Sequence, residues 1–132
     1  MRHAGVSLAC PDWPLCTGQV VPSLAGPTGV VFAHRLAALA AVVLLAWLSL
    51  RTRGVPSLGP VARAAFGLAL LQSLSGALVV TTRLGLFSAL GHAAIMAVLF
   101  CALALLARRA LAAAPRYTYN AGPRGEVIRI TP

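Results

Sequence analysis

The 132-residue chain contains no lysine and only two acidic residues, Asp12 and Glu126. Charged residues make up 10% of the sequence and aromatic residues 6%, whereas 59% of the residues are hydrophobic. A soluble domain of this size needs more polar surface than this composition supplies. The shortage of charge therefore argues against an ordinary soluble domain and indicates an integral membrane protein.

All eleven basic side chains are arginines, which give a net charge of +9. Nucleic acid is the simplest partner for such an excess, but the arginines flank apolar segments and form no basic stripe, so we expect no nucleic-acid partner. By the positive-inside rule, the two main clusters place the first connection between apolar segments and the C-terminus in the cytoplasm. These clusters are Arg51, Arg53 and Arg63, and Arg108, Arg109 and Arg116.

Three apolar segments, about 31–50, 63–82 and 87–107, are long enough to cross roughly 30 Å of hydrocarbon. They predict an all-α integral membrane protein of the cell membrane, with a multi-pass helical bundle over 30–110. An outward-facing loop (1–29) precedes the bundle and a cytoplasmic polar tail (111–132) follows it. Because an outward-facing first loop normally needs a preceding helix, we expect either a truncated start at Met1 or a chain that is half of something larger.

His34 and His92 lie inside the first and third apolar segments. An ionisable ring in hydrocarbon costs free energy unless something binds it. The two segments run in the same direction on neighbouring helices, which places both rings about 5–8 Å below the outer boundary. Two imidazoles at one depth predict axial ligation of a haem iron, whereas zinc lacks a third and fourth ligand at that depth. The alternative is that each is an interfacial or hydrogen-bonded core histidine.

Arg35 and the polar residues of the second segment have two interpretations each. Arg35 follows His34 at the membrane mouth, where it either pairs with a haem propionate or extends to the lipid headgroups. Gln72 either packs the bundle or bonds a histidine nitrogen or a buried substrate group, and Ser73 and Ser75 lie beside it.

The outer loop contains Cys10 and Cys16, separated by five residues that include two prolines. This spacing is compatible with a disulfide but does not prove one. The pair either staples the loop over the bundle or exchanges electrons or thiols near the haem. A metal-binding pair lacks support, because His3 is the only other ligand type nearby.

Four segments together resemble the haem A synthase family: RHAGVSLACPDWPLCTGQVVP, FAHRLAAL, LLQSLSGALVVTTRL and LGHAAIMAVLF. The resemblance covers roughly Arg2 to Arg108 and implies one four-helix haem-binding bundle that lacks its first helix. The family oxidises a methyl group of haem O to a formyl group, giving haem A for terminal oxidases. The resemblance thus implies an oxidoreductase.

Carried over to this chain, His34 and His92 match the axial histidines, and Cys10 and Cys16 match paired loop cysteines found in many members. The implied cofactors are haem b, haem O or both. The implied partners are a haem O synthase, an electron-transfer partner, and a second copy or missing half. Many members carry a glutamate where this chain has Val31, so no catalytic residue is assigned. A non-catalytic bis-histidine cytochrome b and a truncated partner subunit are the alternative functions.

Overall fold

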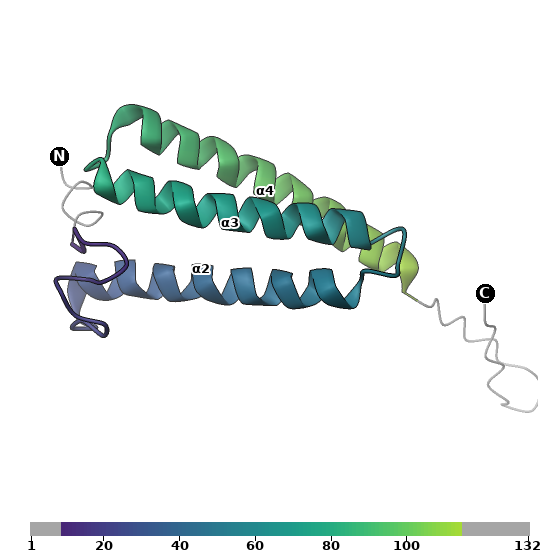
Figure 1. Cartoon of the computed structure of the whole chain (residues 1–132), viewed down its shortest axis with the longest axis horizontal. Coiled ribbons are helices and arrows are strands. Elements are labelled where there is room, and N and C mark those ends of the chain that lie inside the picture. The colour runs from purple at the N-terminus through teal and green to yellow at the C-terminus, as the bar shows by residue number, and fades with distance from the viewer. Residues whose placement is uncertain (1–8, 115–132) are drawn as a thin grey trace, which may run out of the picture.

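The computed structural model of the chain describes residues 9–114. Within them it forms three helices, α2 (Gly26–Arg51), α3 (Gly59–Thr81) and α4 (Leu86–Ala113), and no strand beyond an isolated bridge between Cys16 and Gln19 (Figure 1). The predicted all-α architecture with three long apolar helices is confirmed.

Each helix is long enough to cross a membrane. The 26, 23 and 28 residues of α2, α3 and α4 correspond to about 39, 35 and 42 Å at 1.5 Å per residue, more than the roughly 30 Å of a hydrocarbon core. Large apolar side chains project outward from all three, including Leu44, Leu74 and Phe100 at 62–64% exposure. Such apolar outer surfaces are typical of helices surrounded by lipid.

The helix boundaries differ from the predicted ones. Helix α2 begins five residues earlier than expected and α3 four residues earlier, because Pro27 and Pro60 stand in their first turns, where proline needs no donor. Helix α4 continues six residues beyond the predicted end, through Arg108 and Arg109 to Ala113. Most of the predicted tail (115–132) and the first eight residues of the predicted loop lie outside the described residues.

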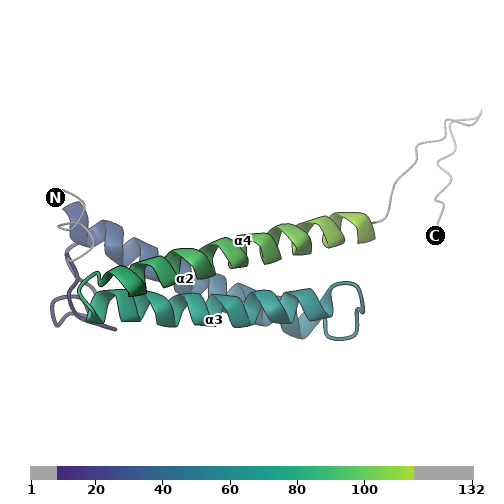
Figure 2. The same ribbon diagram turned by 90° about the horizontal axis from the view of Figure 1, so that it is seen from above.

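Helix α3 is the central helix of the bundle. The helices alternate in direction, with short connections at 52–58 and 82–85, so α2 and α4 run parallel to each other and antiparallel to α3 (Figure 1). Extensive contacts join α3 to α2 and α3 to α4 (Figure 2). The two histidine-bearing helices, α2 and α4, therefore each pack mainly on α3.

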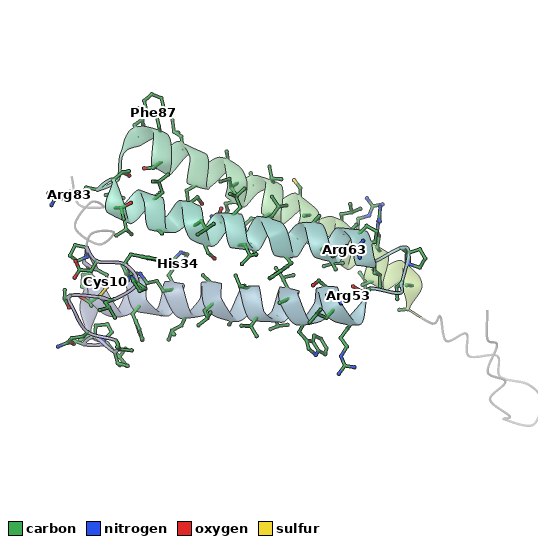
Figure 3. The ribbon with its side chains drawn as sticks, viewed as in Figure 1. Cys10, His34, Arg53, Arg63, Arg83 and Phe87 are labelled. Atoms are coloured by element: carbon green, nitrogen blue, oxygen red, sulfur yellow. A yellow bond between two sulfur atoms is a disulfide. The ribbon has the colours of Figure 1, made fainter. Side chains whose placement is uncertain are left out.

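The two ends of the bundle are named here by what they carry. The loop end comprises residues 9–25 and the 82–85 turn. The arginine end carries the 52–58 connection and the C-terminus of α4, together with Arg51, Arg53, Arg63, Arg108 and Arg109. Figure 3 shows Cys10, His34 and Arg83 toward one end and Arg53 and Arg63 at the other.

The core lies in the half nearer the arginine end. Its centre is a stripe of alanines on α3 that packs against Leu45 of α2 and Leu106 of α4; the alanines are Ala62, Ala65 and Ala69. Small side chains let helix backbones approach closely where there is no water to drive apolar association. Two buried polar residues of this half, Ser49 and the C-cap residue Thr52, donate to the α2 carbonyls of Ala46 and Leu48.

The half nearer the loop end is packed differently. Among the buried helical residues that the structure describes, only Gly29 lies in this half. A Cβ at Gly29 would collide with the backbone carbonyl of Leu24, so glycine permits the loop to fold tightly onto α2. At the other turn, the hydroxyls of Thr82 and Ser88 lie 2.6 Å apart. The loop end is thus closed by its connections, with little helix-to-helix core beneath them.

Candidate functional site

His92 is held against α3 through both of its ring nitrogens. The Nε2 atom of Gln72 lies 3.1 Å from His92 Nε2, and the hydroxyl oxygen of Ser75 lies 2.8 Å from His92 Nδ1. Gln72 and Ser75 are three residues apart and so share one face of α3. The sequence interpretation in which Gln72 bonds a histidine nitrogen agrees with this contact. Ser73 bonds instead to Ala69 O of its own helix, at 2.9 Å.

Gly76 provides the space for the His92 ring. A Cβ built on Gly76 would lie 3.3 Å from Cε1 and 3.8 Å from Nδ1 of His92. A contact of 3.3 Å is tighter than most real Cβ contacts, so a larger residue here would displace the ring. The Cε1–Nδ1 edge of the ring therefore faces α3 at Gly76.

His34 occupies the corresponding part of α2. It is solvent- or lipid-exposed, lies on the α3 side of α2 (Figure 3), and makes no hydrogen bond to another residue between 9 and 114. His34 follows the first residue of α2 by eight positions and His92 follows that of α4 by six, which is about 12 and 9 Å of helix. Both histidines thus lie within the first nine residues of two parallel helices, on the side of the loop end.

Arg35 is directed into the outer loop. Its Nη1 donates to the carbonyl oxygens of Pro14 and Leu15 at 3.3 and 2.9 Å, and its Nη2 to those of Cys10 and Asp12 at 3.1 and 3.0 Å. A guanidinium has five N–H groups, four of them on these two nitrogens. A haem propionate, one of the two partners considered for Arg35, would have only the Nε–H left to it while these four bonds remain.

The loop that Arg35 holds is closed by a disulfide between Cys10 and Cys16. Both cysteines are almost fully buried, at 0% and 2% exposure. The cysteine Cα atoms are 4.6 Å apart, within the range that a disulfide spans. The only carboxylate side chain among the described residues, Asp12, is exposed in this loop.

A shallow opening lies between this loop and the end of α3. It measures about 440 Å³ and is lined by Pro11, Asp12, Val80, Thr81 and Arg83. The opening is partly polar and faces the loop end, so it contributes no packed core to this half of the bundle.

The donor set at this end consists of imidazoles. Between residues 9 and 114, no three His, Cys, Asp or Glu side chains gather closely enough to hold a metal ion among them. Two imidazoles are the axial ligands that a haem iron accepts, because the porphyrin supplies the other four nitrogens. Gln72 Oε1 is buried without a hydrogen-bond partner beside His92. Unsatisfied buried amide oxygens are uncommon in folded proteins.

Two contributors to this site were not assigned from the sequence as partners of His92, namely Ser75 and Gly76. A signal was present, because residues 72, 75 and 76 are spaced i, i+3 and i+4 and therefore project from one helix face. Which residues they contact depends on which helix packs on that face. The spacing does not reveal that helix.

Comparison with known proteins finds several relatives named Heme A synthase. A protein of Symbiobacterium thermophilum is 45% identical over 95 residues, which cover 70% of this chain and 31% of the relative. One from Alkalihalophilus pseudofirmus is 36% identical over 110 residues, or 80% of this chain and 37% of the relative. One from Geobacillus thermodenitrificans is 35% identical over 129 residues, or 92% of this chain and 40% of the relative.

No family model matches the chain and no solved structure matches it significantly. The matched part of the chain spans only 31–40% of the length of these curated relatives. The resemblance expected from the motifs is confirmed, and by homology over most of its length this chain belongs to the haem A synthase family.

Proposed function

We propose that this chain provides a haem-binding bundle of a haem A synthase, with the iron held between His34 and His92. The observation that carries the proposal is the pair of histidines in the loosely packed half of the bundle, one of them oriented by Gln72 and Ser75. Imidazole nitrogens suit haem iron, and the relatives' printed name, Heme A synthase, supports this cofactor.

The reaction proposed is oxidation of the methyl group of haem O to a formyl group. The haem supplies the redox chemistry when bound, since no side chain of this chain is an oxidant. The chain's own contribution is to hold the macrocycle by two imidazoles in an apolar half-bundle and to cover the loop end with the disulfide loop. Excluding water from such a pocket strengthens the electrostatic interactions inside it.

The proposed placement is in the cell membrane, with the loop end outside and the arginine end in the cytoplasm. Five described arginines and no described acid lie at the arginine end, as the positive-inside rule requires of a cytoplasmic side. The proposed cofactors are haem b, haem O or both. Haem O synthase, an electron acceptor, and a second copy or missing half that completes the bundle are the proposed partners.

A non-catalytic bis-histidine cytochrome b is the second candidate function. It is favoured by the absence of any carboxylate from the three described helices, where Val31 stands in place of a glutamate. A proton-accepting group for methyl oxidation would then have to come from a partner. A partner subunit without haem of its own is the third candidate.

Pigment analysis distinguishes these candidates. The full chain is co-expressed with a haem O synthase, purified, and its extracted haem is identified. Conversion to haem A supports the enzyme, retention of unconverted haem supports the cytochrome, and no Soret absorbance supports the partner subunit. His34→Ala and His92→Ala are each expected to abolish most of the bound haem, with Cys101→Ser, at an exposed position of α4, as control.

A further inference from the structure

The hydrogen bonds around Ser75 determine which nitrogen of His92 carries the proton. Ser75 Oγ lies 2.9 Å from the Gln72 carbonyl oxygen and 2.8 Å from His92 Nδ1. A hydroxyl has one proton, and a carbonyl oxygen can only accept. Both contacts are satisfied together only if Ser75 donates to the carbonyl and His92 donates its Nδ1–H to Ser75.

The other side of the ring agrees with this assignment. A neutral imidazole with its proton on Nδ1 has a lone pair on Nε2. The Gln72 amide nitrogen, which can only donate, faces that atom at 3.1 Å. The contacts of both ring nitrogens therefore describe one tautomer, with Nε2 as the acceptor.

Space around the ring favours the same atom as a ligand. Cε1 and Nδ1 are the ring atoms nearest to a Cβ built on Gly76, so α3 at this glycine lies closer to Nδ1 than to Nε2. Among the described residues, only the Gln72 amide forms a hydrogen bond with Nε2. The Oε1 of that amide is buried with no partner, so moving the amide away from the ring breaks a single hydrogen bond.

We propose that Ser75 is a positioning residue that fixes His92 as an iron ligand through Nε2, and that Gln72 is a placeholder that donates to Nε2 until iron replaces it. This rests on the proposed function. The Nε2 lone pair of His92 would bond the iron in place of the Gln72 N–H···Nε2 bond, and no proton would be transferred. A hydrogen bond from the second ring nitrogen orients a metal-bound histidine and raises its basicity.

Ferric haem b titrated into the full chain in detergent micelles tests the proposal, with binding followed by Soret absorbance. Ser75→Ala is expected to weaken haem binding about 10-fold or more, as loss of such a bond does in other metal sites, and to alter the reduction potential of the bound haem. Ser75→Thr retains the hydroxyl and is expected to restore both. Ser73→Ala is the matched control, because Ser73 bonds only to its own helix, and it should change affinity less than twofold.

The Gln72→Leu variant tests whether Gln72 competes with iron for Nε2 or instead helps to hold the haem. Removing a competing hydrogen bond worth about 1 kcal/mol predicts haem binding about 5-fold tighter. Weakening by Gln72→Leu as severe as that by His92→Ala would overturn the placeholder role. Equal effects of Ser75→Ala and Ser73→Ala would overturn the role of Ser75.

A measurement without haem distinguishes failure of this inference from failure of the proposed function. In ¹⁵N NMR of the haem-free chain with neutral histidines, His92 is expected to be protonated on Nδ1. The opposite tautomer would overturn the inference even if both histidines bind haem. If His92→Ala leaves haem binding unchanged, the proposed ligation itself is wrong, whatever the tautomer.

Discussion

The two halves of the bundle are built from similar apolar helices, yet they do different things. In the half nearer the arginine end, alanines on α3 bring α2 and α4 close and form the core. In the half nearer the loop end, almost no helical residue is buried, and the polar side chains Gln72, Ser75 and His92 bond one another between α3 and α4. One half contains the packed core, and the other, with little helix-to-helix core, is the half in which we propose that haem binds.

The comparison predicts that the largest loss of stability comes from overfilling the alanine stripe. Ala65 is 0% exposed, whereas the adjacent Ala64 is exposed. Ala65→Phe is expected to lower the free energy of unfolding by roughly 3 kcal/mol, because a ring at this position forces the helices apart. Unfolding in mixed detergent micelles measures the loss, with Ala64→Phe as control. Equal losses for both variants would show that this half is not the packed one.

The disulfide is expected to have the next largest effect. A Cys10→Ser, Cys16→Ser double variant removes a cross-link that closes a short loop, which is worth about 2 kcal/mol on the chain-entropy model. If the pair is a staple, thermal stability falls while the spectrum of the bound haem is unchanged. A changed haem spectrum at equal stability would favour the redox-active interpretation instead.

A smaller and more local effect is expected at Arg35. Lysine carries the same charge but lacks the planar fork that reaches four carbonyls, so Arg35→Lys should weaken the attachment of the loop by about 1 kcal/mol. We expect the weaker attachment of the loop to appear as faster amide hydrogen exchange over 10–16 and as faster reduction of the disulfide by a thiol. Arg83→Lys is the control, because the Arg83 side chain donates no hydrogen bond within residues 9–114. Matching exchange rates in the two variants would contradict the role of Arg35 as a clamp.

The smallest expected effects are on helix stability and haem affinity when either of two glycines of α3 is replaced by alanine. A Cβ on Gly67 meets nothing within 4 Å, whereas one on Gly76 meets the His92 ring at 3.3 Å. Gly67→Ala should stabilise the helix by up to about 1 kcal/mol and leave haem binding unchanged. Gly76→Ala should gain less stability and lower haem affinity about 3-fold, which corresponds to roughly 0.6 kcal/mol. Equal haem affinities in both variants would mean that Gly76 does not position the ring.

Much of the fold was predictable because membrane helices are governed by length and apolarity. The three spans were found from hydrophobic runs alone, and the positions of Pro27 and Pro60 account for most of the error at the starts of α2 and α3. Proline is common in loops, but the first turn of a helix also accepts it. The end of α4 was missed because Arg108 and Arg109 interrupt the apolar run but not the helix.

The site was only partly predictable. His34 and His92 were identified because an ionisable ring in an apolar run is costly, and Gln72 was considered as a partner of a histidine. The loop contacts of Arg35 were not among its two interpretations from the sequence. They arise because the loop folds back over α2 and offers four carbonyls to the guanidinium. Spacing along one helix carries no information about a loop that is twenty residues away in sequence.

The sequence by itself determined that this chain is an all-α membrane protein of the haem A synthase family, since composition, apolar length and motif order depend only on the residues and their neighbours. Only the tertiary structure decided that α3 lies between the two histidine helices, and that Ser75, Gly76 and Gln72 hold His92. The physical reason is that helical periodicity fixes which residues share a face, whereas packing between helices decides what that face meets.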